Sequence, residues 1–246
     1  MDDERFTRTF ADQVAALPGV RAVTLGGSRT QGHTDAAADW DFALYYRNRF
    51  DAGAVREAGW EGEVAEPGGW GGGVMNGGAW LRVDGRKVDL HYRDLDEVEH
   101  WWDEAKAGRF QKQLLLFYLA GIPTYVVVAE LALNRVLVGE LPRPQYPAAL
   151  AREAPPRWHR DALLTLSYAE AALRRRQDAV TAAGNLARAI VEESHARLAA
   201  RREWVLNEKG LAARAGLGHL ADSIARPDGA GWLDRVLSAA RAEIGV

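Results

Sequence analysis

Two aspartates, Asp39 and Asp41, stand two residues apart at the start of a run of aromatic and branched residues that extends to Tyr46. The composition of this run predicts a β-strand. Successive side chains on a strand point to opposite faces, so both carboxylates are expected on the same face. Aspartate is disfavoured inside strands, and two of them in an apolar strand therefore need a reason. The structural alternative is a solvated strand edge or turn.

A third carboxylate, Asp89, lies between Val88 and Leu90 in a second expected strand, 87–92. It faces away from these apolar neighbours, and we expect it to enter the same cleft as the aspartate pair. Carboxylates that lie close together repel each other unless a cation lies between them. Mg²⁺ prefers carboxylate oxygens and bound phosphates, and three carboxylates can hold two metal ions for an in-line phosphoryl displacement. The alternative for Asp89 is a buried ion pair with Arg93 or Lys87.

The strand expected at 20–25 ends in Gly26-Gly27-Ser28-Arg29. Glycine lets the backbone approach a phosphate closely, and amides at a following helix start can bind phosphate oxygens. Ser28 adds a hydroxyl donor, and Arg29 can bind a phosphate through two hydrogen bonds. The turn is therefore a candidate phosphate site, with a helix cap or a solvated side chain as the alternative for Arg29.

Taken in order, the Gly-Gly-Ser turn, the Asp-x-Asp pair about a dozen residues later and the strand aspartate Asp89 resemble the nucleotidyltransferase superfamily, which includes polymerase β-like and antibiotic-modifying enzymes. The resemblance implies that Asp39 and Asp41 bind metal, that Asp89 completes the metal site or acts as a base, and that Gly27 and Ser28 hold a triphosphate. Many members carry Ser directly before the aspartate pair. This chain has Ala38 there, so a hydrogen bond that could orient the first aspartate is missing.

Two further runs, 85–93 and 206–210, resemble a bacterial branch of that superfamily with a helical C-terminal domain. The resemblance implies that Lys209 reaches the triphosphate, whereas its structural alternative is a solvated cation at a helix end. The glycine-rich segment 67–78 is expected to form a loop beside the site. Its Trp70, and Trp80 beyond it, either stack on a base or acceptor or serve only in packing.

The rest of the pattern predicts an α+β protein: a nucleotidyltransferase-type mixed sheet with flanking helices, then an all-α helical bundle. We expect helices over 6–17 and 51–58, and a third helix that Asp94 caps and that runs to about Lys106. Strands over 79–83 and 87–92 are expected to be joined by a turn at Asp84-Gly85. One or two buried helices are expected within 111–138, and three or four helices after Trp158, with breaks at Gly184, around Gly210 and at Pro227-Asp228-Gly229. Five prolines between Leu141 and Pro156 favour a linker there. The expected domains are 1–140, the nucleotidyltransferase core, and 157–246, the C-terminal helical domain.

Composition narrows the functional classes. The net charge is −3, which gives no global basic field for nucleic acid. There are no cysteines, so disulfides, thiolate zinc sites and thiol nucleophiles are excluded. No apolar run approaches the roughly 20 residues of a membrane span. The acidic N-terminus lacks the apolar core of a signal peptide, so we expect a cytoplasmic protein.

The residues and the resemblance together predict a Mg²⁺-dependent enzyme that transfers a nucleoside monophosphate, AMP from ATP, to a hydroxyl of a small-molecule acceptor and releases pyrophosphate. One alternative is a tRNA- or protein-modifying, toxin-like nucleotidyltransferase, which would need a local basic surface. Another is a catalytically inactive nucleotide-binding module, against which the intact carboxylates argue. The oligomeric state and the nucleotide base are left open by the sequence.

Overall fold

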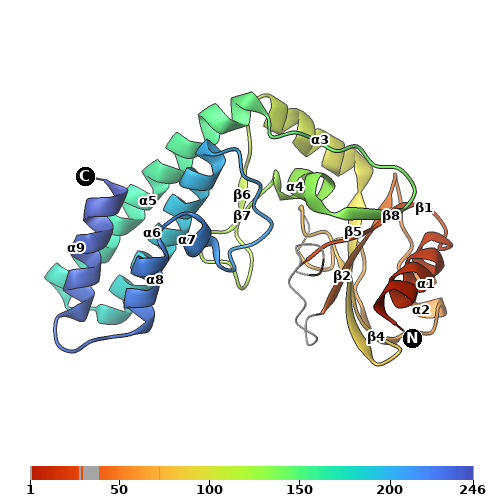
Figure 1. Ribbon diagram of the computed structural model, residues 1–246, viewed down its shortest axis with the longest axis horizontal. Coiled ribbons are helices and arrows are strands. Elements are labelled where there is room, and N and C mark those ends of the chain that lie inside the picture. The colour runs from red at the N-terminus through yellow and green to blue at the C-terminus, as the bar shows by residue number, and fades with distance from the viewer. Residues whose placement is uncertain (1, 28, 30–38, 72, 246) are drawn as a thin grey trace. The chain divides into compact units, whose positions relative to one another are not determined.

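The computed structural model describes residues 2–27, 29, 39–71 and 73–245. The chain divides into two compact units (Figure 1). The first, called the sheet unit here, is formed by Met1–Asp103 and Tyr125–Gln145. The second, called the helical unit, is formed by Glu104–Thr124 and Tyr146–Val246. The division is discontinuous along the chain, whereas the sequence pattern suggested a single break near residues 141–156.

The sheet unit contains a six-stranded mixed sheet in the order β3-β4-β5-β2-β1-β8. Strands β2 and β5 are parallel, and the other neighbouring pairs are antiparallel. The strands are β1 (Val20–Leu25), β2 (Trp40–Tyr46), β3 (Glu61–Val64), β4 (Gly78–Val83), β5 (Arg86–Asp94) and β8 (Arg135–Val138). Asp84 and Gly85, both with positive φ, form the turn between β4 and β5, as the sequence predicts.

Four helices of the described residues accompany this sheet: α1 (Asp3–Ala15), α2 (Gly53–Glu57), α3 (Leu95–Lys106) and α4 (Val126–Leu133). Helix α1 begins where the Asp2 side chain accepts a hydrogen bond from the Arg5 amide at 2.8 Å. Its Phe6, Phe10 and Val14 are buried because they recur at helical spacing. A mixed sheet with flanking helices, followed by a helical region, is therefore confirmed as the fold class.

Because side chains alternate in direction along β2, the two faces of the sheet carry different residues. Trp40 and Phe42 of β2 point toward α1, where Phe6 packs against Trp40 and Phe10 against Phe42 with ring centroids 4.9 and 4.8 Å apart. Asp41 of β2 therefore points to the opposite face. Burial of aromatic residues on the α1 side stabilises the sheet unit, and on the opposite face Asp41 is followed along β2 by the buried Ala43 and Tyr45.

The helical unit contains α5 (Ala148–Arg176), α6 (Ala179–Ala200), α7 (Leu211–Arg214), α8 (Gly218–Ala225) and α9 (Trp232–Ile244), and the short strands β6 (Lys112–Gln113) and β7 (Ile122–Pro123). Segment 104–124 belongs to this unit because Lys112 forms an ion pair with Asp161 and Phe110 stacks on Trp158. Within the part of the chain that the structure describes, the helices lack the combination of length and apolar character that a membrane span requires.

Three sequence-based expectations in this region were wrong. The expected linker 141–156 becomes helical at Ala148, and α5 continues through Pro155 and Pro156. Proline inside a helix costs about 3 kcal/mol, and burial of Leu150, Ala154 and Trp158 on the same helix offsets that cost. Gly184 does not break α6, since glycine weakens a helix by only about 1 kcal/mol. Five helices, not three or four, lie wholly or partly after Trp158 in the described chain, because α5 spans this residue and α6, α7, α8 and α9 follow it.

The apolar segment 111–138 supplies one buried helix, α4, within the one or two that the sequence predicts. Besides this short helix, it contains the three strands β6, β7 and β8. Between β6 and β7 the chain reverses through a loop in which Leu114, Leu116 and Phe117 are exposed. Gly121, with φ +84°, and Pro123 oppose a continuous helix here.

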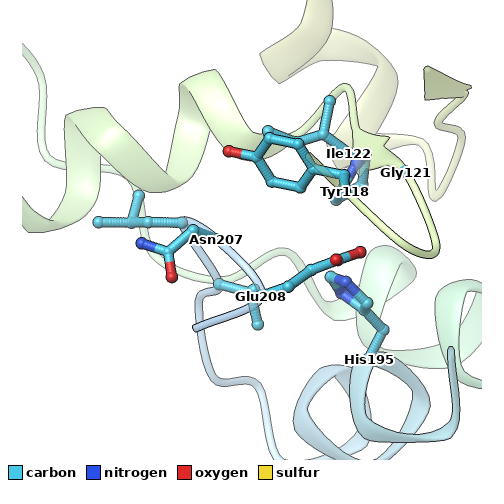
Figure 2. A pocket seen from close by; sticks show the side chains of 9 residues that line it. Tyr118, Gly121, Ile122, His195, Asn207 and Glu208 are labelled. Atoms are coloured by element: carbon cyan, nitrogen blue, oxygen red, sulfur yellow. The ribbon is translucent and has the colours of Figure 1, made fainter. Parts of the chain in front are cut away.

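His195 lies at the centre of the helical unit. Its ring stacks on Trp158 with centroids 4.2 Å apart, and its side chain is 2% exposed. Neither ring nitrogen has a hydrogen-bond partner among the described residues. Burial, and then the nearby charge of Lys112, lower the pKa of His195 to about 3. His195 also lines a small pocket with Asn207 and Glu208 (Figure 2), which has no room for a water molecule.

The depressed pKa of His195 predicts an acid-labile helical unit. The stability that depends on neutral His195 is fully present above the unfolded pKa of about 6.5 and is lost as pH falls toward the folded pKa of about 3. Between pH 7 and pH 5 this amounts to about 2 kcal/mol. His195→Phe keeps a ring against Trp158 and should remove this part of the pH dependence, as measured by urea unfolding at both pH values. An equal loss of stability in the variant would contradict the assignment to His195.

Candidate active site

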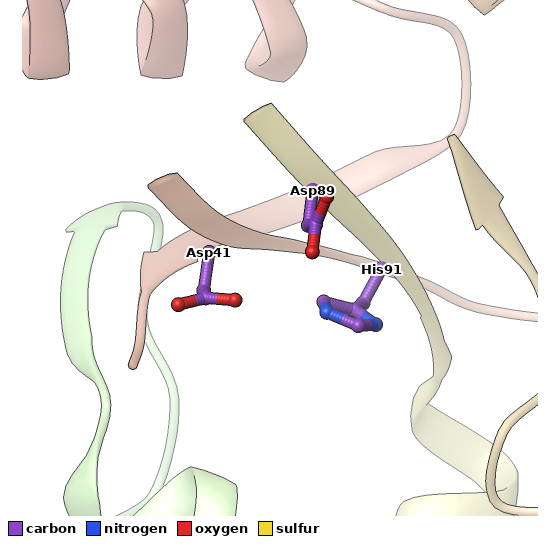
Figure 3. A group of neighbouring side chains, drawn as sticks. All are labelled: Asp41, Asp89 and His91. Carbon is purple, nitrogen blue, oxygen red and sulfur yellow. The ribbon is translucent and has the colours of Figure 1, made fainter. Parts of the chain in front are cut away.

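The parallel pairing of β2 and β5 brings two of the predicted carboxylates together. Asp41 is the register partner of Asp89, so both side chains project from the same face of the sheet. Both are partly buried. Figure 3 shows them on adjacent strands, with the imidazole of His91 beside them.

His91 is a site residue that the sequence reasoning missed. It follows Asp89 by two positions on β5 and therefore shares its face. One ligand atom from each of Asp41, Asp89 and His91 lies within 4.8 Å of the others. The same period-two spacing that singled out Asp39 and Asp41 would have found Asp89 and His91.

The imidazole of His91 is held against the edge of Trp70, with ring centroids 5.7 Å apart. Its Nδ1 atom is buried and has no hydrogen-bond partner among the described residues. Burial, and then the positive charge of Arg93, lower the pKa of His91 to about 4. At neutral pH the ring is therefore uncharged, and one of its nitrogens has a lone pair to offer a ligand.

Asp39 immediately precedes β2 and is exposed. It is not part of the group of three within the described residues. Asp39 shares a face of the sheet with Asp41 only if the extended strand geometry continues through residue 39. Its part in metal binding stays a prediction.

The Gly26–Gly27 turn lies directly against Asp41. The Gly26 amide donates a hydrogen bond to the Asp41 carbonyl oxygen at 2.7 Å. Gly27 has φ +69°, and a Cβ atom there would lie 1.8 Å from Oδ2 of Asp41. Only glycine fits, both because of its backbone conformation and because of the carboxylate beside it. Ser28, predicted to bind phosphate, lies outside the described residues.

Gly27→Ala should therefore displace the Asp41 carboxylate. We expect the variant to lose most metal-dependent nucleotide binding, and to lose about 1 kcal/mol of stability or somewhat more because alanine at positive φ is strained. Calorimetric titration of the variant with ATP and Mg²⁺ measures the first effect, and thermal unfolding the second. Gly59→Ala is a matched control, since Gly59 has φ +76° but open space at its Cβ position. Equal nucleotide binding by both variants would contradict the role of the Gly27–Asp41 contact.

The two predicted phosphate-binding cations lie in different surroundings. The Arg29 guanidinium lies 4.0 Å from the centroid of the Trp40 ring and 3.4 Å from the Asp3 carboxylate, on the α1 side of the sheet. Lys209 is exposed in the helical unit, where its amide donates to Asn207. The neighbouring Glu208 accepts hydrogen bonds from the amides of Leu119 and Ala120 at 2.7 and 2.8 Å. The part of Arg29 and Lys209 in nucleotide binding stays a prediction.

A buried ion pair supports the same face of the sheet. Arg93, two residues beyond His91 on β5, donates from Nε and Nη2 to the carboxylate of Glu130 on α4 at 2.5 and 2.7 Å. The Arg93 side chain is 2% exposed, and that of Glu130 is 14% exposed. Burial is the largest single influence and opposes both charges. The attraction between the two groups and their hydrogen bonds together outweigh it, so the pKa of Arg93 is raised and that of Glu130 is lowered. The pair attaches α4 to the sheet close to the candidate site.

The donor set fits a divalent cation. Two carboxylates this close repel each other, and a hard cation relieves that repulsion while it keeps further positions for phosphate oxygens and water. A neutral imidazole nitrogen without a protein partner adds a third donor. Because carboxylates outnumber imidazole in the group, Mg²⁺ or Mn²⁺ fits it better than zinc.

Comparisons with known proteins show a likeness to solved structures and none to a family model or a curated sequence. Among solved structures, a nucleotidyltransferase-like protein from Exiguobacterium sibiricum 255-15 is similar over 99% of this chain and 78% of that chain, with 11% identity and a TM-score of 0.42. A likeness at this TM-score carries no argument about function.

Proposed function

We propose that this protein is a Mg²⁺-dependent nucleotidyltransferase that moves a nucleoside monophosphate, AMP from ATP, onto a hydroxyl of a small-molecule acceptor. The observation that carries the proposal is the register pairing of Asp41 with Asp89 on parallel strands, with His91 on the same face. A glycine turn that only glycine can form lies against Asp41. Carboxylates that can hold a metal ion, beside a backbone turn that a phosphate can approach closely, suit the transfer of a nucleotidyl group.

Asp41 and Asp89, with Asp39 as the predicted third carboxylate, are the residues proposed to hold Mg²⁺. When bound, the ion neutralises charge that develops on the phosphate oxygens during transfer. Asp41 is positioned by the Gly26 amide and by Gly27, and Asp89 by its strand neighbours. This positioning removes the need to reorganise the site during reaction.

The proposed step is an in-line displacement at the α-phosphorus. Asp89 accepts the proton of the acceptor hydroxyl, and the hydroxyl oxygen forms a bond to the α-phosphorus. The bond from the α-phosphorus to the oxygen that bridges to the β-phosphate breaks, and its electron pair leaves with pyrophosphate. Backbone amides at Gly27 and the hydroxyl of Ser28 are proposed to bind the departing phosphates.

A small-molecule acceptor is proposed on the basis of charge. The chain has 31 Lys and Arg residues against 34 Asp and Glu residues, and its net charge is −3. Proteins that bind nucleic acid derive much of their affinity from phosphate neutralisation by Lys and Arg, which favours a basic surface. Transfer to tRNA is thus a less favoured alternative, and transfer to a protein is the other alternative.

The test is pyrophosphate release from each of the four nucleoside triphosphates in the presence of Mg²⁺. We expect ATP to support release that depends on a hydroxylated small molecule and stops when EDTA removes the metal. Panels of tRNA and of protein acceptors distinguish the alternative. If ATP fails to bind in a Mg²⁺-dependent manner by calorimetry, the proposed function is wrong.

A further inference from the structure

A pair of stacked tryptophans lies beside the candidate metal ligands. Trp80 on β4 is the antiparallel register partner of Asp89, so both side chains are on the same face of the sheet. The rings of Trp70 and Trp80 stack with centroids 4.8 Å apart and an interplanar angle of 23°. Trp80 is nevertheless 50% exposed, which leaves part of a large apolar ring in solvent next to a carboxylate.

The pair is held in place by the residues around it. Trp70 contacts His91 edge-on and lies over Gly78, the register partner of His91. A Cβ atom at Gly78 would lie 2.5 Å from the Trp70 ring, so this glycine makes room for the indole. Trp70 is thereby inserted between Trp80 and His91 and supports the position of Trp80. Ring contacts with Trp80 and His91 account for the position of Trp70, but packing does not account for the half-exposed indole of Trp80.

The sheet order places Trp80 on one side of the carboxylates and the glycine turn on the other. Strand order is β4-β5-β2-β1, which corresponds to Trp80, Asp89, Asp41 and then the Gly26–Gly27 turn at the end of β1. In an in-line displacement the attacking and leaving oxygens lie on opposite sides of the phosphorus. If pyrophosphate leaves on the side of the turn, the acceptor hydroxyl approaches from the side of Trp80.

We propose that the exposed face of Trp80 is the acceptor subsite, and that the acceptor carries its hydroxyl on or next to a flat ring that stacks on this indole. Stacking on an aromatic side chain is tolerant of ring identity because it uses the face of the ring and not its edge. Asp89, the cross-strand neighbour of Trp80, then lies where it can accept the proton of the hydroxyl. This inference rests on the proposed function, because it takes the side of the glycine turn as the side of the leaving group.

Saturation-transfer NMR with benzyl alcohol as the probe tests the subsite directly. The full chain is saturated with Mg²⁺ and α,β-methylene-ATP, which cannot be cleaved at the α-phosphorus. We expect benzyl alcohol to bind while the analogue is bound and 1-butanol, which has no ring, to bind much more weakly. Trp80→Ala should weaken benzyl alcohol binding about tenfold, and Trp80→Phe should retain most of it. Leu133→Ala, which removes another exposed apolar side chain, should leave it unchanged.

Three results would overturn the proposal. Benzyl alcohol binding that does not depend on Trp80 would show that its exposed face is not a ring subsite. Loss of benzyl alcohol binding when the analogue is added would assign the indole to the nucleobase. Weaker Mg²⁺-dependent binding of the analogue itself in Trp80→Phe would assign a structural role. Failure of the wild-type chain to bind the analogue by calorimetry would instead overturn the proposed function, and the acceptor assignment with it.

Discussion

Asp41→Asn is expected to reduce ATP-dependent pyrophosphate release about 10³-fold, because a loss of about 4 kcal/mol of charge stabilisation corresponds to that factor. The amide is nearly isosteric with the carboxylate, so it fits beside Gly27. The hydrogen bond from the Gly26 amide goes to the backbone carbonyl oxygen at position 41 and is therefore retained. The substituted side chain brings no negative charge to the cation that Asp41 and Asp89 are proposed to share. Mg²⁺-dependent ATP binding, measured by calorimetry, should fall with the activity, while the melting temperature should not decrease.

Asp84→Asn is the matched control for this substitution. Asp84 lies in the turn between β4 and β5 with φ +49°, a conformation that asparagine adopts readily. The control should keep wild-type activity and stability. Full activity in Asp41→Asn, or an equal loss in Asp84→Asn, would contradict the metal-binding role of Asp41.

Arg93→Met is expected to destabilise the sheet unit by about 3–5 kcal/mol, which is the usual cost of removing one partner of a buried ion pair. The substitution leaves the Glu130 carboxylate buried without the two hydrogen bonds that Arg93 donates to it. Methionine fills similar space, so the effect is due mainly to the uncompensated charge. Urea unfolding at pH 7 measures the change in the free energy of unfolding.

The double variant Arg93→Met with Glu130→Leu separates charge from packing. Replacing both partners removes the buried charge, and we expect most of the lost stability to return. A double variant as unstable as Arg93→Met would show that packing, not the unpaired carboxylate, is responsible.

The effect of Arg93→Met should also depend on pH. In the wild type the pKa of Glu130 is lowered, so the stability from the pair is present above the unfolded pKa of about 4.3 and is lost as pH falls through the folded pKa. In Arg93→Met the buried carboxyl is easier to protonate, since burial then acts alone. The difference in stability between the two proteins should therefore narrow as pH decreases from 7 toward 4. A constant difference would show that Glu130 is not the titrating group.

Local patterns were enough to predict much of the sheet unit. The strand over 20–25 was predicted with its observed bounds, and the strand at 39–46 and the turn at Asp84-Gly85 were found close to their observed positions. Burial was the deciding influence where prediction was wrong. Pro155 and Pro156 stay inside α5 because Trp158, two residues on, is fully buried. No local propensity could reveal that stabilisation, because it comes from contacts that are distant in sequence.

In the candidate site, too, some features follow from the local sequence pattern and others from tertiary contacts. The spacing of Asp39 and Asp41, and the placement of Asp89 between apolar residues, determined which side chains could share a face, since alternation along a strand is a property of the local backbone. The register between β2 and β5 was not contained in either strand. It depends on how the connections and the core fix one strand beside the other, and it alone paired Asp41 with Asp89 and brought His91 to them. The same tertiary contacts placed Arg29 over Trp40, on the opposite face from the carboxylates.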